Sequence, residues 1–130
     1  NHCTVTGGQA GIYEAGLDSG TTVVKNCIFT DLTASGMNNA ARGELVNISN
    51  LYFNNTNDAV NTTVNTPPRC GAQRDPMFLP FAETPCLPAN HSPVRYAGTD
   101  GTCLGALPPR DNLFHQWGRR RWSVPRKEGP

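Results

Sequence analysis

Proline is absent from the first 66 residues of this 130-residue chain, although the chain contains 11 prolines. Charge is also scarce, because Asp, Glu, Lys and Arg make up 16% of the residues and the formal net charge is +1. An average soluble domain carries about 25% charged residues, so a highly charged disordered protein is excluded. The sequence also lacks any apolar run of roughly 18 residues, and we expect no membrane-spanning helix.

Proline and charge divide the chain into three segments. Residues 1–66, the body, are rich in Asn, Thr and Gly and exclude proline, which indicates sheet because Pro cannot donate to a strand ladder. Residues 67–112, the cap, are rich in Pro and are expected to be irregular. Residues 113–130, the tail, hold five basic side chains and one acidic. The formal charges of the three segments are −3, 0 and +4, so the body and the tail attract each other.

The tail carries a basic and aromatic cluster that consists of Trp117, Arg119, Arg120, Arg121 and Trp122. Two tryptophans in so short a segment predict that the tail docks onto the protein's own assembly. An anionic polysaccharide is the alternative partner. Nucleic acid is not expected, because the rest of the chain has an extracellular composition.

The body contains an internal repeat. Two sets of equivalent residues recur every 24 positions, namely Cys3, Cys27 and Leu51, and Val5, Phe29 and Phe53. A period of this length indicates a solenoid. Short runs rich in Thr, Val, Ile and Phe favour strands, and the Gly and Asn clusters between them favour turns. We therefore expect an inner ladder of Val5, Phe29 and Phe53, with Tyr52 facing outward and Asn26 stacked with Asn50.

Segments 26–29 (NCIF) and 36–37 (GM) resemble the short coil repeat of the pectate-lyase-like proteins. Segments 75–78 (DPMF), 90–93 (NHSP) and 104–107 (LGAL) are similar to the terminal segment of many extracellular proteins of that family. The resemblance covers residues 1–108. It implies an all-β fold, a right-handed parallel β-helix (solenoid) fragment with an irregular Pro-rich C-terminal cap. It does not imply one function, because the family includes lyases, hydrolases, epimerases, adhesins and structural proteins.

The first coil of such a solenoid would present a bare strand edge, which invites pairing. We therefore expect the chain to continue onto further β-helix coils before Asn1, or to meet another protein chain at this edge.

Five cysteines in a small chain indicate an oxidising compartment, so a secreted, extracellular or cell-surface location is expected. One disulfide is expected among Cys70, Cys86 and Cys103, with Cys70–Cys86 and Cys86–Cys103 as the candidates. Cys3 and Cys27 occupy equivalent positions on adjacent coils. They would form either a disulfide or a pair of buried thiols, and the thiols are the favoured alternative.

Four Asn-x-Ser/Thr sequons are candidate glycosylation sites if the source is eukaryotic, at Asn47, Asn54, Asn61 and Asn90. Sequons also arise by chance in a chain this rich in Asn and Thr.

The resemblance implies a Lys or Arg base, often with Ca²⁺, for an enzyme of this kind. The body offers only Lys25 and Arg42 as bases, and the sequence around Arg42 lacks the Arg-x-Pro-x-x-Arg pattern of the lyases. Asp31, Asn55 and Asp58 would supply oxygen ligands for Ca²⁺ if they lie together. Asp31 and Asp58 would also be the carboxylate pair of a glycoside hydrolase.

Outward-facing aromatic rings and amides are suited to sugars, and Tyr13, Tyr52, Asn54 and Asn55 are the candidate contacts. No coherent catalytic set is visible, and we expect no cofactor other than Ca²⁺. We therefore expect a non-catalytic extracellular β-helix module, structural or carbohydrate-binding, within a larger assembly or a longer chain. The alternative is the C-terminal part of a secreted polysaccharide lyase or glycoside hydrolase.

Overall fold

The computed structural model describes residues 1–16, 19–62, 64–80 and 86–109. The tail, with Trp117, Arg119, Arg120, Arg121 and Trp122, lies outside the described residues. The body forms nine strands within the described part: β1 (Thr4–Thr6), β2 (Ala10–Glu14), β3 (Thr21–Lys25), β4 (Ile28–Thr30), β5 (Ser35–Asn39), β6 (Glu44–Ile48), β7 (Leu51–Phe53), β8 (Ala59–Val60) and β9 (Val64–Thr66).

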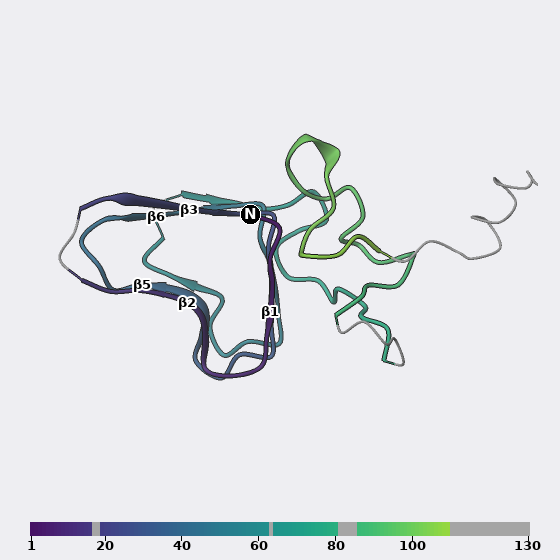
Figure 1. Cartoon of the computed structure of the whole chain (residues 1–130), viewed down its shortest axis with the longest axis horizontal. Helices are drawn as coiled ribbons and strands as arrows, with labels where there is room; N and C mark the ends of the chain where they lie inside the picture. The colour runs from purple at the N-terminus through teal and green to yellow at the C-terminus, as the bar shows by residue number, and fades with distance from the viewer. Residues whose placement is uncertain (17–18, 63, 81–85, 110–130) are drawn as a thin grey trace, which may run out of the picture.

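These strands form three parallel sheets of three strands each: sheet A is β1-β4-β7, sheet B is β2-β5-β8 and sheet C is β3-β6-β9. Each sheet takes one strand from each of three successive turns of the chain. We call these turns coil 1 (β1–β3), coil 2 (β4–β6) and coil 3 (β7–β9). The coils lie over one another when viewed along the stack (Figure 1). The architecture is therefore all-β and solenoid-like.

Left-handed backbone conformations mark the two corners that flank sheet A. The residues with positive φ are His2, Asn26 and Ser49 before the sheet, and Gly7, Asp31 and Asn54 after it. Gly, Asn and Asp accept this conformation with the least strain. The Asn-rich and Gly-rich turns of the sequence therefore supply corners that recur once in every coil.

The inner core is organised around two stacked aromatic rings. The Phe29 and Tyr52 ring centroids lie 5.5 Å apart, with 14° between the ring planes. Both side chains are buried with Met37 and Leu45. Gly36 makes room for the stack, because a Cβ there would lie 2.8 Å from the Tyr52 ring and 2.6 Å from the Asp58 carbonyl oxygen. The small residue at this point of the repeat is therefore a packing requirement.

The register between coils 2 and 3 differs from the 24-residue alignment. Tyr52 pairs with Phe29, and Leu51 pairs with Ile28, a spacing of 23 residues. A shift of one residue moves every side chain of a strand to the opposite face. Tyr52 is therefore the inner residue at 3% exposure, while Phe53 faces outward at 38%. The expected Val5–Phe29–Phe53 ladder and the outward Tyr52 were wrong.

Two asparagines of coil 3 satisfy backbone groups of coil 2 in the same way. Asn50 accepts from the Cys27 amide at 3.0 Å and donates to the Val24 carbonyl at 2.8 Å. Asn55 accepts from the Leu32 amide at 3.0 Å and donates to the Phe29 carbonyl at 2.9 Å. Unpaired backbone groups at buried corners would be costly, so these amides hold coil 3 on coil 2.

Asn26 does not stack with Asn50, contrary to the sequence-based expectation. Its side-chain oxygen accepts from the Thr99 amide at 2.8 Å, and its side-chain nitrogen donates to Thr99 Oγ1 at 2.8 Å. The 23-residue spacing places Asn50 beside Cys27, which leaves Asn26 to bind the cap.

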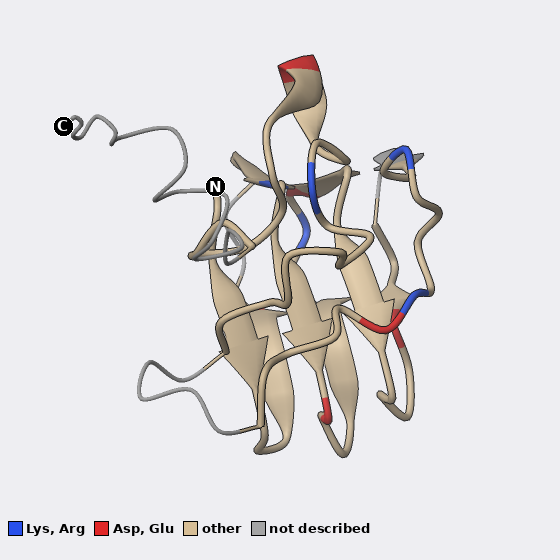
Figure 2. Cartoon of the chain, turned by 90° about the vertical axis from the view of Figure 1, so that its right-hand side faces the viewer, with Lys and Arg blue, Asp and Glu red and all other residues tan. Residues whose placement is uncertain are grey.

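The cap packs against the outer face of sheet A, beside the stack (Figures 1 and 2). Its Val94, Ala97 and Leu104 form a second buried cluster with Ile28 and Leu51 of the body. The described cap residues are irregular, apart from an isolated bridge between Phe78 and Pro88 and a 3-10 turn, η1 (Thr99–Gly101).

The cap also reaches the free side of coil 3. The Tyr52 amide donates to the Ala72 carbonyl at 2.7 Å, and Ala72 packs on the inner core. Ala72 therefore continues the inner ladder beyond Tyr52. Among the described residues, nothing covers Val5 and Ile12 of coil 1 in this way, and both are only partly buried.

The five cysteines are unbridged in the structure, and a disulfide among Cys70, Cys86 and Cys103 stays a prediction. Cys70 donates to the Gly71 carbonyl at 3.4 Å. In the described part of the chain, no helix has the length and apolar character that a membrane span requires.

The crowding at Gly36 yields a stability prediction. Gly36→Ala should lower the free energy of unfolding by about 1–3 kcal/mol, because the methyl group displaces the Tyr52 ring or the Asp58 backbone. Gly20→Ala is the matched control, since a Cβ there meets nothing within 4 Å. Urea unfolding of both variants measures the difference. Equal stability of the two variants would contradict the packing described.

Candidate functional site

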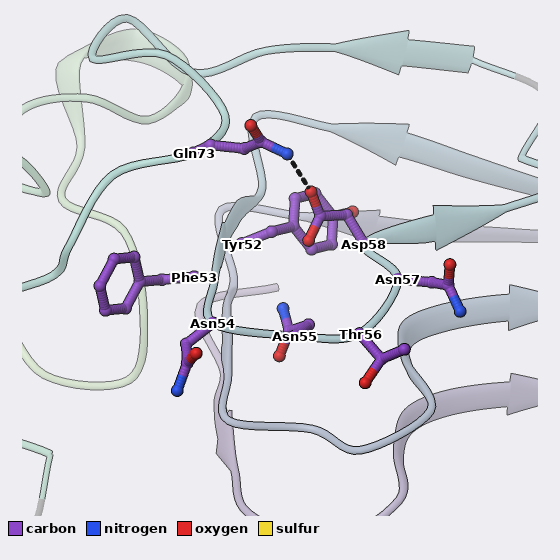
Figure 3. Close-up of a pocket in the computed structure, with 8 residues that line it drawn as sticks. All are labelled: Tyr52, Phe53, Asn54, Asn55, Thr56, Asn57, Asp58 and Gln73. Atoms are coloured by element: carbon purple, nitrogen blue, oxygen red, sulfur yellow. Dashed lines mark hydrogen bonds between the residues drawn. The ribbon is translucent and has the colours of Figure 1, made fainter.

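A groove of about 460 Å³ lies on coil 3 and is lined by residues 52–58 and Gln73 (Figure 3). Coil 3 supplies the corner that follows β7, and the cap supplies Gln73. The two segments are joined where Gln73 Nε2 donates to Asp58 Oδ2 at 2.5 Å. The groove is therefore built from segments far apart in the sequence, and it exists only when the cap is docked.

Hydrogen-bonding groups dominate the walls of the groove. Asn57 and Thr56 are exposed, and the Gln73 amide points toward Asp58 (Figure 3). Asp58 is the only charged residue among the described residues that line it, so no basic side chain is present. Phe53 points away from the groove in Figure 3. The site is thus suited to a polar ligand held by several hydrogen bonds.

Tyr52 forms the buried wall of the groove. Its hydroxyl donates to Asn47 Oδ1 at 2.9 Å, and Asn50 Nδ2 donates to the same oxygen at 2.6 Å. Burial is the main cause that raises the pKa of the Tyr52 phenol. Tyr52 therefore remains protonated. It lines the groove as a buried residue and not as an outward one, and a sugar contact of its own stays a prediction.

The burial of Asn47 does not favour a glycan at this sequon. It is 1% exposed, and its side-chain oxygen accepts from both Asn50 and Tyr52. Asn54, Asn61 and Asn90 are exposed, and glycosylation of these three stays a prediction.

The three expected calcium ligands have separate hydrogen-bond partners. Asp31 accepts from Asn54 Nδ2 at 2.5 Å, whereas Asp58 accepts from Gln73. The Asn55 side chain is engaged with the backbone of coil 2 on both its oxygen and its nitrogen. In the residues described, no group of three or more His, Cys, Asp or Glu side chains is placed to hold a metal ion. Calcium binding stays a prediction that these contacts do not favour.

The structure separates the expected sugar contacts. Asn54 and Asn55 line the groove, whereas Tyr13 lies on β2 in coil 1, 62% exposed and outside it. Sequence analysis missed Thr56, Asn57 and Gln73. Thr56 and Asn57 lie in the same polar run as Asn54 and Asn55, which was a usable signal. Gln73 had none, because only the folded cap brings it to coil 3.

A scan against models of protein families, a search of curated proteins and a search of solved structures each found no match to this chain.

The buried phenol predicts how stability depends on pH. A phenol whose pKa is raised in the folded state stabilises the fold below its ordinary pKa of 10.0, and this stability is lost as the pH rises above that value. We expect the free energy of unfolding to fall by up to about 1.4 kcal/mol per pH unit above pH 10 from this group. Urea unfolding at a series of alkaline pH values measures it.

Tyr52→Phe should flatten this alkaline slope while lowering stability at neutral pH, because Asn47 loses a donor. Tyr13→Phe is the control, since that phenol is exposed, and it should change neither quantity. An unchanged alkaline slope in Tyr52→Phe would contradict the burial of this phenol.

Proposed function

We propose that this chain is a non-catalytic carbohydrate-binding module of a secreted protein, and that the groove on coil 3 holds the sugar. The fold that we propose for it is a right-handed parallel β-helix of the pectate-lyase-like kind, working within a larger assembly. The observation that carries the proposal is the groove itself, with amide, hydroxyl and carboxylate groups around one opening.

The groups on the groove walls are those that bind sugar hydroxyls. Three oxygens on the groove walls accept or donate no protein hydrogen bond among the described residues, so they are available to a ligand. They are Thr56 Oγ1, Gln73 Oε1 and Asp58 Oδ1. Hydrogen bonds already position two of the groove side chains. Gln73 donates to Asp58, and Asn57 donates to the Ala34 carbonyl at 3.0 Å. Such prior positioning lowers the entropy that binding would cost.

The charge of the groove favours neutral sugars over uronates. Asp58 is its one charged side chain among the described residues, and no cation is present to pair with a uronate carboxylate. The Tyr52 ring is almost fully covered, so ring stacking contributes little and hydrogen bonds carry the affinity. We therefore expect weak binding of neutral oligosaccharides.

The alternative, a fragment of a polysaccharide lyase or glycoside hydrolase, is less well supported by the same groove. Proton abstraction beside a uronate needs a base together with cationic stabilisation, and no Lys, Arg or His is found among the described residues that line the groove. Glycoside hydrolysis needs a second carboxylate facing Asp58. Asp31, the proposed partner, is not among the lining residues.

A binding titration tests the proposal. Neutral oligosaccharides derived from glucan, xylan and mannan, and oligogalacturonate as the charged probe, should be titrated into the full chain and followed by NMR chemical shifts. We expect shifts at Thr56, Asn57 and Gln73 with at least one neutral series. Asn57→Ala and Gln73→Ala should each weaken that binding by roughly 5- to 30-fold, the loss of one or two hydrogen bonds.

Tyr96→Ala is the matched control, because Tyr96 is 60% exposed in the cap and lies outside the groove. It should leave the affinity unchanged. Shifts that gather around Tyr13 instead, or no shifts with any sugar, would overturn the assignment of the groove. Calcium-dependent binding of oligogalacturonate would favour the enzyme-fragment alternative.

A further inference from the structure

Cys3 and Cys27 lie one above the other on coils 1 and 2. The residues that follow them, Thr4 and Ile28, are paired in parallel register. The Ile28 amide donates to the Cys3 carbonyl at 2.9 Å, so the parallel ladder extends to the residue next to Cys27. Neighbouring strands lie about 4.8 Å apart, and disulfides span Cα separations of about 4.4–6.8 Å. The backbone spacing therefore suits a disulfide.

The two side chains also have the same local orientation. Cys3 Sγ donates to the Asn1 carbonyl at 3.7 Å, and Cys27 Sγ donates to the Lys25 carbonyl at 3.2 Å. Each thiol thus contacts the carbonyl two residues before it, so the two Cα–Cβ bonds point in the same direction. Coil 3 has Asn50 at this position, and no third thiol competes within the stack.

We propose that Cys3 and Cys27 are a reversible disulfide site that joins coil 1 covalently to coil 2. The oxidant is a small-molecule disulfide of the glutathione class, which reacts by thiol–disulfide exchange. The site goes beyond the proposed sugar binding, because it lies on coil 1 and includes no residue of the groove.

The exchange has a defined order because the two thiols differ in exposure. Cys3 is exposed, whereas Cys27 is 2% exposed. Burial raises the pKa of the Cys27 thiol, so Cys3 meets the oxidant first. The Cys3 thiolate attacks one sulfur of the oxidant, its S–S bond breaks, and one small thiol leaves after taking up a proton. Cys27 then loses its proton, attacks Cys3 Sγ and expels the second small thiol.

The net change is two protein thiols and one small disulfide converted to one protein disulfide and two small thiols. Electrons and protons balance without any further reactant. A thiol reductant of the same class reverses the reaction.

The bond would add a covalent link to the strand pairing that joins coil 1 to coil 2. Among the described strands, β1, β2 and β3 each pair with a single strand of coil 2. Joining residues 24 positions apart removes freedom from the unfolded chain, so the oxidised protein should melt roughly 5–10 °C above the reduced one. The redox state would thereby set how firmly the coil 1 edge is held.

The test uses the full chain with Cys70→Ser, Cys86→Ser and Cys103→Ser, so that only Cys3 and Cys27 remain. The folded protein is incubated in oxidised glutathione, quenched by alkylation and weighed intact. We expect the loss of two hydrogens, no retained glutathione and no alkylated thiol. The same protein in urea should form the bridge on the order of tenfold less readily, because the effective concentration that the register provides is lost.

Two single variants in this background check the order of the steps. Cys27→Ser should retain one glutathione on Cys3, whereas folded Cys3→Ser should retain none, because Cys27 is covered. If the triple variant does not fold, peptide mapping of the oxidised five-cysteine chain serves instead and should recover a peptide that links Cys3 to Cys27. Two alkylated thiols, a stable glutathione adduct at Cys3 or bridging only to cap cysteines would overturn the proposal.

Discussion

The contact between the Phe29 and Tyr52 rings fixes how the coils sit on one another. Their centroids are 5.5 Å apart, close to the spacing of adjacent strands, so the ring stack and the backbone ladder demand the same register. Gly36 leaves space beside the Tyr52 ring. Once Tyr52 is inside, Leu51 and Ile28 must face outward, and only a cap with its own apolar residues can cover them. The position of the cap, and with it Gln73 in the groove, therefore follows from one aromatic pair.

Asparagine side chains also hold the coils and the cap together, through hydrogen bonds at the corners. Asn50 and Asn55 each bind one backbone donor and one backbone acceptor of coil 2. Asn26 binds the cap at Thr99, where it accepts from the backbone amide and donates to the side-chain hydroxyl. The high Asn content of the body is thus largely a way of satisfying polar groups at corners where no strand ladder continues. The amides and hydroxyls around Asn57, which line the groove on coil 3, are the groups that the proposed ligand would meet.

The sequence was informative about the repeat and about the strands and turns within it. The internal repeat of about 24 residues, together with the proline-free body and the turn residues, predicted stacked parallel strands in an all-β, solenoid-like fold. The register of coil 3 was not predictable in this way, because Leu51, Tyr52 and Phe53 are all apolar and each fits either face. The structure pairs the Tyr52 hydroxyl of coil 3 with Asn47 at the end of coil 2, a contact that no spacing rule reveals. The part that Gln73 plays in the groove could not be predicted from the sequence either, because only the folded cap brings Gln73 to Asp58.

The pairing of rings in solution tests this account most directly. A nuclear Overhauser experiment on the labelled chain should show cross-peaks between the ring protons of Phe29 and Tyr52, and none between Phe29 and Phe53. Cross-peaks from Phe29 to Phe53, with Tyr52 exposed to solvent, would restore the 24-residue register and contradict both the buried phenol and the groove built beside it.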